Sequence, residues 1–198
     1  LGGSAIAHYL DVTDIHSIKA SVKKALSHFP DIRILVNNAG VMQKGMGADL
    51  TTDDFDLCYS VNLKGVWLMS EALIPHFKQA NEGKIVNIAS IGGRKGAAYA
   101  SAYCTSKAAV ISLTQSLAAE LGPDNINVNA VCPGTTWTPM YEQIEAIASQ
   151  QKNTKDAIAQ RVEFKKNIDQ TQLGRACTPE DIGHAVVFLA SEQAKNIT

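Results

Sequence analysis

The chain has 198 residues and a mass of 21.2 kDa, which is enough for one domain with a sizeable hydrophobic core. Apolar residues make up 45% of it and charged residues 19%, a globular balance that excludes a disordered or collagen-like chain. The 18 basic and 19 acidic residues give a net charge of −1, so neither nucleic acid nor an acidic membrane is expected as a partner. No apolar run approaches the roughly 20 residues needed to span a bilayer.

Four cysteines lie far apart in the sequence, namely Cys58, Cys104, Cys132 and Cys177. They form no CxxC pair, and no histidine stands near them at the spacing of metal ligands. This usage predicts free thiols in a cytoplasmic protein and no metal site.

Strand-like and helix-like segments alternate along the first half of the chain. Asp14 and a Thr51 or Thr52 cap are typical of helix starts. The predicted elements are a strand over 6–12, a helix after Asp14, a strand over 32–36, and a helix from about 52 towards Pro75.

The second half continues the alternation. Gly122-Pro123 ends a long helical pattern, and Thr178-Pro179 is typical of a capped helix start. The predicted elements are strands over 84–89 and 126–131, and helices over 101–121 and 182–190. Between them, residues 139–172 are polar with weak periodicity, which indicates an insertion over the surface.

Repeated strand–helix alternation with near-continuous apolar strands predicts an α/β fold around a parallel sheet. Ligands of such sheets bind outside the carboxyl ends of the strands. The candidate functional residues are therefore those that directly follow strands: Asp11, Asn37 to Gly40, Ser90, and Pro133 to Thr138.

Tyr103 and Lys107 stand four residues apart on the predicted long helix, so both side chains lie on one helix face. A nearby ammonium stabilises a phenolate and is expected to lower the tyrosine pKa from its usual value near 10. The pair could then move a proton to or from a substrate oxygen. Taken alone, the spacing also fits an ordinary surface pair.

Ser90 precedes Tyr103 by a glycine-rich loop over 91–96 that can bring strand end and helix start to one cleft. Its hydroxyl could hold a carbonyl or alcohol oxygen. Each neighbouring signal has a plainer reading as well: Ser90 as a cap, Asn37-Asn38-Ala39-Gly40 as a turn, and Asn62 as a solvent-facing helix residue.

Six signals nevertheless stand together in order along the whole chain. They are Asp11-Val12-Thr13-Asp14, Asn37-Asn38-Ala39-Gly40, Asn62, Ser90, Tyr103-x-x-x-Lys107 and Pro133-Gly134-x-x-x-Thr138. In order and spacing this set resembles the short-chain dehydrogenase/reductase family. The resemblance implies a single Rossmann-like domain over 1–198, with a doubly wound parallel sheet and helices on both faces.

The resemblance also implies a role for each residue. Tyr103 would be the catalytic acid/base, Lys107 would tune it and bind the coenzyme ribose, and Ser90 would orient the substrate oxygen. Asn62 would bend its helix and hold a water of a proton relay. The implied binding site for NAD or NADP comprises Asp11, Val12, Asn38, Ala39, Gly40, Tyr103, Lys107, Pro133, Gly134, Thr136 and Thr138.

One departure from the family pattern is large, because its glycine-rich phosphate loop is absent and Gly2-Gly3-Ser4 does not replace it. The segment 6–12 resembles the third strand of the family order 3-2-1-4-5-6-7. We therefore expect a fragment without strands 1, 2 and 7, in which 6–12 does not pair directly with 32–36.

The implied activity is NAD(P)-dependent interconversion of a secondary alcohol and a ketone. The long polar stretch 139–173 corresponds to the family's substrate lid and favours a polyol, sugar-alcohol or acetoin-type substrate. The alternatives are a 3-oxoacyl-acyl-carrier-protein reductase and a non-catalytic cofactor-sensing protein; Lys107 speaks against a halohydrin dehalogenase, which has arginine there. Apolar residues around both long helices, with the resemblance, predict a homotetramer.

Overall fold

The core of the molecule is a parallel three-stranded sheet. The computed structural model describes residues 3–42, 50–97, 100–140, 166, 168–169 and 171–198. Strands β1 (Ile34–Asn37), β2 (Gly83–Ile88) and β3 (Ile126–Val131) pair in that order. These strands confirm the predicted parallel sheet and place three of its four predicted strands within three residues of their expected bounds.

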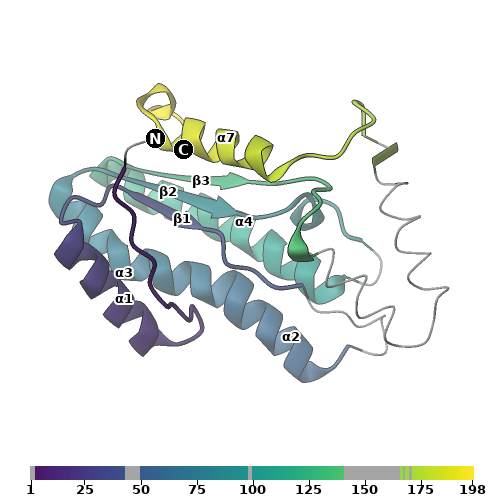
Figure 1. Cartoon of the computed structure of the whole chain (residues 1–198), viewed down its shortest axis with the longest axis horizontal. Helices are drawn as coiled ribbons and strands as arrows, with labels where there is room; N and C mark the ends of the chain where they lie inside the picture. The colour runs from purple at the N-terminus through teal and green to yellow at the C-terminus, as the bar shows by residue number, and fades with distance from the viewer. Residues whose placement is uncertain (1–2, 43–49, 98–99, 141–165, 167, 170) are drawn as a thin grey trace.

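Helices lie on both faces of this sheet, as predicted (Figure 1). On one face α3 (Gly65–Ala80) and α4 (Ser101–Leu121) pack against the strands, and α1 (Ile15–His28) lies along α3. On the other face α7 (Pro179–Ala190) packs on β2 and β3. The main core lies under α3 and α4 and consists of Leu35, Leu73, Ile74, Phe77, Ile85, Leu117, Leu121, Ile126 and Val128.

Helix starts follow the predicted caps. The Asp14 carboxylate accepts a hydrogen bond from the His16 backbone N–H at 2.8 Å and begins α1. Thr51 and Thr178 form capping boxes at the starts of α2 (Thr52–Tyr59) and α7, each with an aspartate three residues on. Such caps stabilise a helix start by about 1 kcal/mol each, so the sequence determines these bounds locally.

The predicted strand over 6–12 is wrong. This segment has no ladder partner in the described sheet, and hydroxyls of α1 hold it instead: Ser21 donates to the Tyr9 carbonyl at 3.1 Å, and Ser17 accepts from the Asp11 backbone N–H at 2.9 Å. Without a neighbouring strand an apolar β-like sequence stays unpaired. The accompanying expectation, that 6–12 does not pair with the strand around 32–36, is confirmed.

The helix predicted to run towards Pro75 also differs from expectation. It continues to Ala80 with Pro75 inside α3, although proline removes one backbone donor and disfavours a helix interior by about 3 kcal/mol. Buried Ile74 and Phe77 on either side anchor that stretch to the core. Between α2 and α3 the helix widens into a π-turn, η2 (Ser60–Lys64), which contains Asn62.

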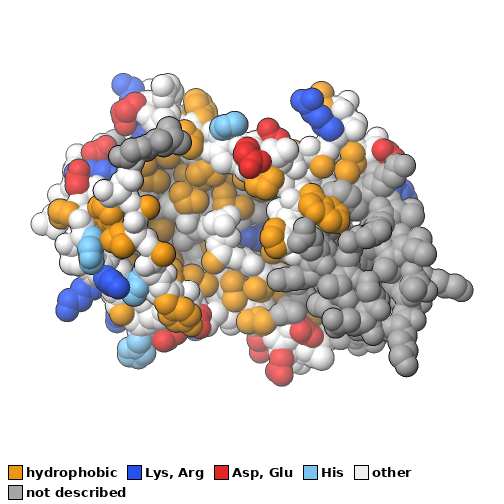
Figure 2. Space-filling model, in the orientation of Figure 1, with side chains coloured by type: hydrophobic (Ala, Val, Ile, Leu, Met, Phe, Trp, Pro, Cys, Tyr) orange, Lys and Arg blue, Asp and Glu red, His pale blue; other side chains and the backbone are white. Residues whose placement is uncertain are grey.

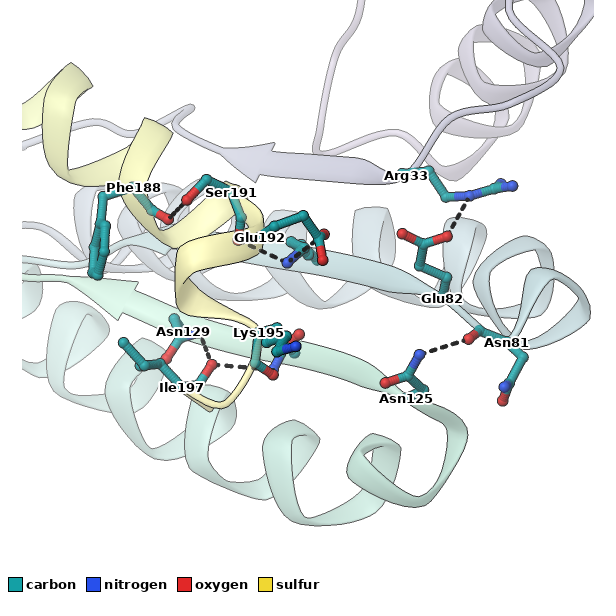
Figure 3. A network of polar contacts seen from close by, with 12 residues as sticks. Arg33, Asn81, Glu82, Asn125, Asn129, Phe188, Ser191, Glu192, Lys195 and Ile197 are labelled. Carbon is teal, nitrogen blue, oxygen red and sulfur yellow. Dashed lines mark hydrogen bonds and ion pairs between the residues drawn. The ribbon is translucent and has the colours of Figure 1, made fainter.

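Polar contacts fasten the C-terminal segment to strands β2 and β3 of the sheet (Figure 3). Buried Lys84 of β2 donates to the Ser191 carbonyl at 2.9 Å and lies 3.5 Å from the Glu192 carboxylate. Asn129 of β3 donates to the Ile197 carbonyl at 2.8 Å. These contacts fix the end of α7, so the helix lies firmly on its face of the sheet.

Apolar side chains gather over the sheet beneath α7 (Figure 2). Ile34 and Val36 of β1 are among the exposed large hydrophobic residues, whereas α7 packs mainly on β2 and β3. No helix in the described ranges has the length and apolar character required to cross a bilayer. Most of the predicted lid, residues 139–173, lies outside the described residues.

Candidate active site

Ser90 stands where the chain leaves β2 at the carboxyl edge of the sheet. Its hydroxyl accepts a hydrogen bond from the Gly92 backbone N–H at 3.0 Å and caps the short 3-10 turn η3 (Ile91–Gly93). The Ile91 backbone N–H donates to the Pro133 carbonyl at 2.9 Å. The segments that follow β2 and β3 therefore meet beside Ser90, as expected for the ligand edge of a parallel sheet.

Helix α4 packs closely on η3 because Gly93 has no side chain. A Cβ on Gly93 would stand 2.6 Å from the Lys107 carbonyl carbon and 2.7 Å from its oxygen, which are backbone atoms that cannot turn aside. Only glycine permits this approach. This close approach brings Tyr103 and Lys107 of α4 to the edge where Ser90 lies. No motif in the sequence predicts the contact at Gly93.

Tyr103 lies in the first turn of α4 and is partly buried. Burial raises the pKa of its phenol above 10, and a hydrogen bond with the Ser90 side chain offsets part of that rise. The phenol is therefore protonated at neutral pH, and it lies in contact with the hydroxyl that the sequence placed beside it.

Lys107 is 4% exposed, one turn after Tyr103. Its Nζ donates to the Ile88 carbonyl at 2.7 Å and lies 5.9 Å from the centre of the Tyr103 ring. Burial lowers the pKa of Lys107 to about 8. The carbonyl at the end of β2 thus compensates an ammonium that is otherwise costly to bury.

The expected lowering of the tyrosine pKa by Lys107 is wrong for this structure. Burial is the main influence on the Tyr103 pKa and acts upward. The Lys107 ammonium is directed to the Ile88 carbonyl rather than to the phenol oxygen, so it does not offset the desolvation of the phenolate.

Asn62 lies in the π-turn and is fully buried. Its Oδ1 accepts from the Val41 backbone N–H at 2.8 Å, and its Nδ2 donates to the Val41 carbonyl, also at 2.8 Å. The plainer reading of Asn62 as a solvent-facing residue is therefore wrong. Its amide clamps the chain just after Gly40, a contact that the spacing in the sequence did not predict.

Three predicted coenzyme residues line one cleft. Val12, Asn38 and Ala39 share a cavity of about 150 Å³ between the N-terminal segment and β1. Gly40 lies nearer to the catalytic candidates: a Cβ there would stand 3.4 Å from both Asn62 Oδ1 and Lys107 Nζ. Asp11 accepts hydrogen bonds from the Thr13 backbone and hydroxyl, which lower the pKa of its carboxyl, so it shapes the turn into α1.

The segment after β3 holds the remaining predicted residues. Pro133 is tied to Ile91, and the Gly134 carbonyl accepts from the Thr136 hydroxyl at 3.3 Å. Thr136 is buried, its backbone forms a β-bridge with Cys177, and its hydroxyl is engaged by the Gly134 carbonyl. Thr138 is partly exposed.

Comparisons with known proteins find relatives along the whole chain. A family model described as enoyl-(acyl carrier protein) reductase matches residues 1–198. Oxidoreductase UcpA of Escherichia coli (strain K12) is 37% identical over 198 residues, which span all of this chain and 73% of that protein. The chain belongs to the short-chain dehydrogenase/reductase family. This is a family of oxidoreductase enzymes.

Solved members of the short-chain dehydrogenase/reductase family share the fold. NAD+-bound xylitol dehydrogenase superposes with a TM-score of 0.87 at 30% identity, covering 96% of this chain and 74% of that one. The 3-ketoacyl-(acyl-carrier-protein) reductase of Brucella melitensis, solved with NADH, gives a TM-score of 0.81 at 34% identity and covers 96% and 72%. The Rossmann-like fold predicted from the sequence is thereby confirmed.

Proposed function

We propose that the protein interconverts a secondary alcohol and a ketone by NAD(P)-dependent hydride transfer. The observation that carries the proposal is the contact between Ser90 and Tyr103, with the Lys107 ammonium buried one turn away. A hydroxyl, a phenol and a cation at the carboxyl edge of a parallel sheet can hold a carbonyl oxygen and give it a proton.

The protonation states favour proton donation at neutral pH. The Tyr103 phenol keeps its proton there because burial raises its pKa, so it can donate to a ketone oxygen that Ser90 orients. In the reverse direction Tyr103 must first lose its proton, so alcohol oxidation gains rate as the pH rises. In the direction of ketone reduction, Lys107 keeps a positive charge one turn from the protonated Tyr103 below about pH 8, since its pKa is about 8.

The residues present fit one part of a nicotinamide coenzyme, without the glycine-rich loop that would hold its phosphates. Val12, Asn38 and Ala39 line a largely apolar cleft, and Gly40 lets the chain pass close to Lys107 and Asn62. When bound, the coenzyme supplies or accepts the hydride. The likeness to an NAD+-bound and an NADH-bound enzyme supports NAD or NADP as that coenzyme.

The substrate class we propose is a polyol, sugar alcohol or acetoin-type compound. The long polar stretch 139–173 and the likeness to xylitol dehydrogenase support it. The likeness to the Brucella melitensis reductase, at a higher identity, supports 3-oxoacyl-acyl-carrier-protein reduction as a second candidate. Both candidates use the same Ser90, Tyr103 and Lys107.

We further infer a cytoplasmic homotetramer. Phe55, Leu57 and Trp67 of the α2–α3 region are each at least 40% exposed, which leaves an apolar surface for a partner subunit. The cysteines of the described part of the chain form no disulfide, which supports a reducing compartment.

Coenzyme binding followed by a substrate panel tests the proposal. The protein is titrated with NADH and NADPH under fluorescence detection, then assayed with xylitol, galactitol, acetoin and an acetoacetyl thioester. We expect saturable binding of one coenzyme and turnover of a polyol in excess of the thioester. Saturable binding with no turnover of any compound would favour a cofactor-sensing protein instead.

A further inference from the structure

Three buried contacts of one kind join the helices to their neighbours. In each, a helix hydroxyl donates to a carbonyl of its own helix and accepts from an asparagine amide. Two of them are joined into one chain across the face of the sheet that α3 and α4 cover, from Ser70 of α3 through Asn37 and Asn87 to Thr114 of α4. The third joins Asn62 Nδ2 to the Ser106 hydroxyl at 3.0 Å.

The Ser106 contact differs from the others by its place. Ser106 is fully buried between Tyr103 and Lys107 in the sequence of α4, and its hydroxyl donates to the Tyr103 carbonyl at 2.8 Å. Thr114 makes the same pair of contacts two turns further along α4, at 2.7 Å to Val110 and 2.9 Å from Asn87. Thr114 therefore provides a chemically matched contact remote from Tyr103 and Lys107.

The hydrogen bonds of Asn62 show what the Ser106 hydroxyl determines. Nδ2 divides its two N–H groups between Ser106 and the Val41 carbonyl, which leaves Oδ1 to accept from the Val41 N–H. Oδ1 and Lys107 Nζ each lie 3.4 Å from the position of a Cβ on Gly40, so both border the same point of the chain. Loss of the Ser106 acceptor would leave a buried N–H of Asn62 unpaired and would hold the amide from its Val41 side alone.

We propose that Ser106 is a positioning residue of the active site, which fixes the Asn62 amide and thereby the surroundings of Gly40 and Lys107. This inference rests on the proposed function. A positioning error of this kind reduces turnover by tenfold to about 100-fold, because reacting groups tolerate little displacement. Among the described residues, the titratable groups that face Lys107 are Tyr103 on its own helix and Cys58 of α2, and both are retained in the Ser106 variants.

The test compares Ser106→Ala with the matched variant Thr114→Ala, and Ser106→Cys serves as a near-isosteric variant with a weaker acceptor. Turnover is measured from pH 6 to 9.5. We expect Ser106→Ala to lose at least tenfold in kcat and to shift the alkaline limb of ketone reduction, with a smaller shift in Ser106→Cys. Thr114→Ala should leave the limb unmoved. If Ser106→Ala does not fold, a shift of the limb in Ser106→Cys supports the inference, and a limb that stays at the parent's position in Ser106→Cys overturns it.

A second readout separates this inference from the proposed function. The free energy of unfolding is measured at pH 7.5 and 9.5, where its change reports the Lys107 ammonium without any substrate. We expect the rise in the free energy of unfolding between pH 7.5 and 9.5 to differ from the parent's in Ser106→Ala and to equal the parent's in Thr114→Ala. Equal behaviour of the two alanine variants in both readouts would overturn the inference. Inactivity of the parent protein on every substrate would overturn the proposed function alone.

Discussion

Replacement of Lys107 by methionine tests the buried ammonium directly. Burial lowers the pKa of Lys107 from 10.5 to about 8, so between these values the unfolded chain holds a proton that the folded chain has released. Because the unfolded state binds more protons, the free energy of unfolding rises with pH across this window. At about 1.4 kcal/mol per pH unit, the rise between pH 7.5 and 9.5 is about 2 kcal/mol.

Urea titrations followed by circular dichroism at these two pH values measure the effect. Lys107→Met should lack this rise, so the difference between parent and variant should change by about 2 kcal/mol. Lys78→Met is the control: Asp124 raises the pKa of the exposed Lys78, so its contribution to stability is lost only at higher pH. A difference between parent and Lys107→Met that stays constant from pH 7.5 to 9.5 would refute the reasoning.

Two further predictions concern the same edge of the sheet. Gly93→Ala should lower turnover and lower the free energy of unfolding by on the order of 1–3 kcal/mol, because the new methyl group overlaps the Lys107 backbone. Gly96→Ala is the control, since Gly96 is exposed and a Cβ there meets open space. Equal stability of the two variants would contradict the packing described. The rate of ketone reduction should fall as the pH rises through about 8, because Lys107 loses its charge there while Tyr103 is still protonated. A rate that stays constant to pH 9.5 would show that the ammonium is not needed.

Local signals in the sequence predicted much of the fold. The Asp14, Thr51 and Thr178 caps each begin a helix as expected, because capping depends on residues a few positions apart. The prediction of a strand over 6–12 was wrong because a strand needs a hydrogen-bonded neighbour, which a local apolar pattern does not supply. The prediction that the helix runs only towards Pro75 was wrong for the opposite reason. Tertiary packing around Phe77 outweighs the local cost of proline in a helix, so α3 continues to Ala80.

Some features of the active site were likewise predictable from the sequence, and others were not. The i, i+4 spacing correctly placed Tyr103 and Lys107 together, and the glycine-rich loop correctly brought Ser90 to them. The direction of the Tyr103 pKa was not predictable, because it depends on burial and on the carbonyl that takes up the Lys107 ammonium. The approach of Gly93 to α4 likewise involves backbone atoms that no sequence motif specifies.

Conversion of Tyr103 to phenylalanine, with turnover and coenzyme affinity measured on the same preparation, tests the central claim most directly. The change removes only the phenol oxygen, and the ring can still pack against α4 and beneath Lys107. General acid–base catalysis contributes about 10²–10⁴-fold, so kcat should fall by at least 100-fold while the coenzyme Kd stays within a few-fold. A variant that turns over within a few-fold of the parent would contradict the assignment of Tyr103 as the proton donor.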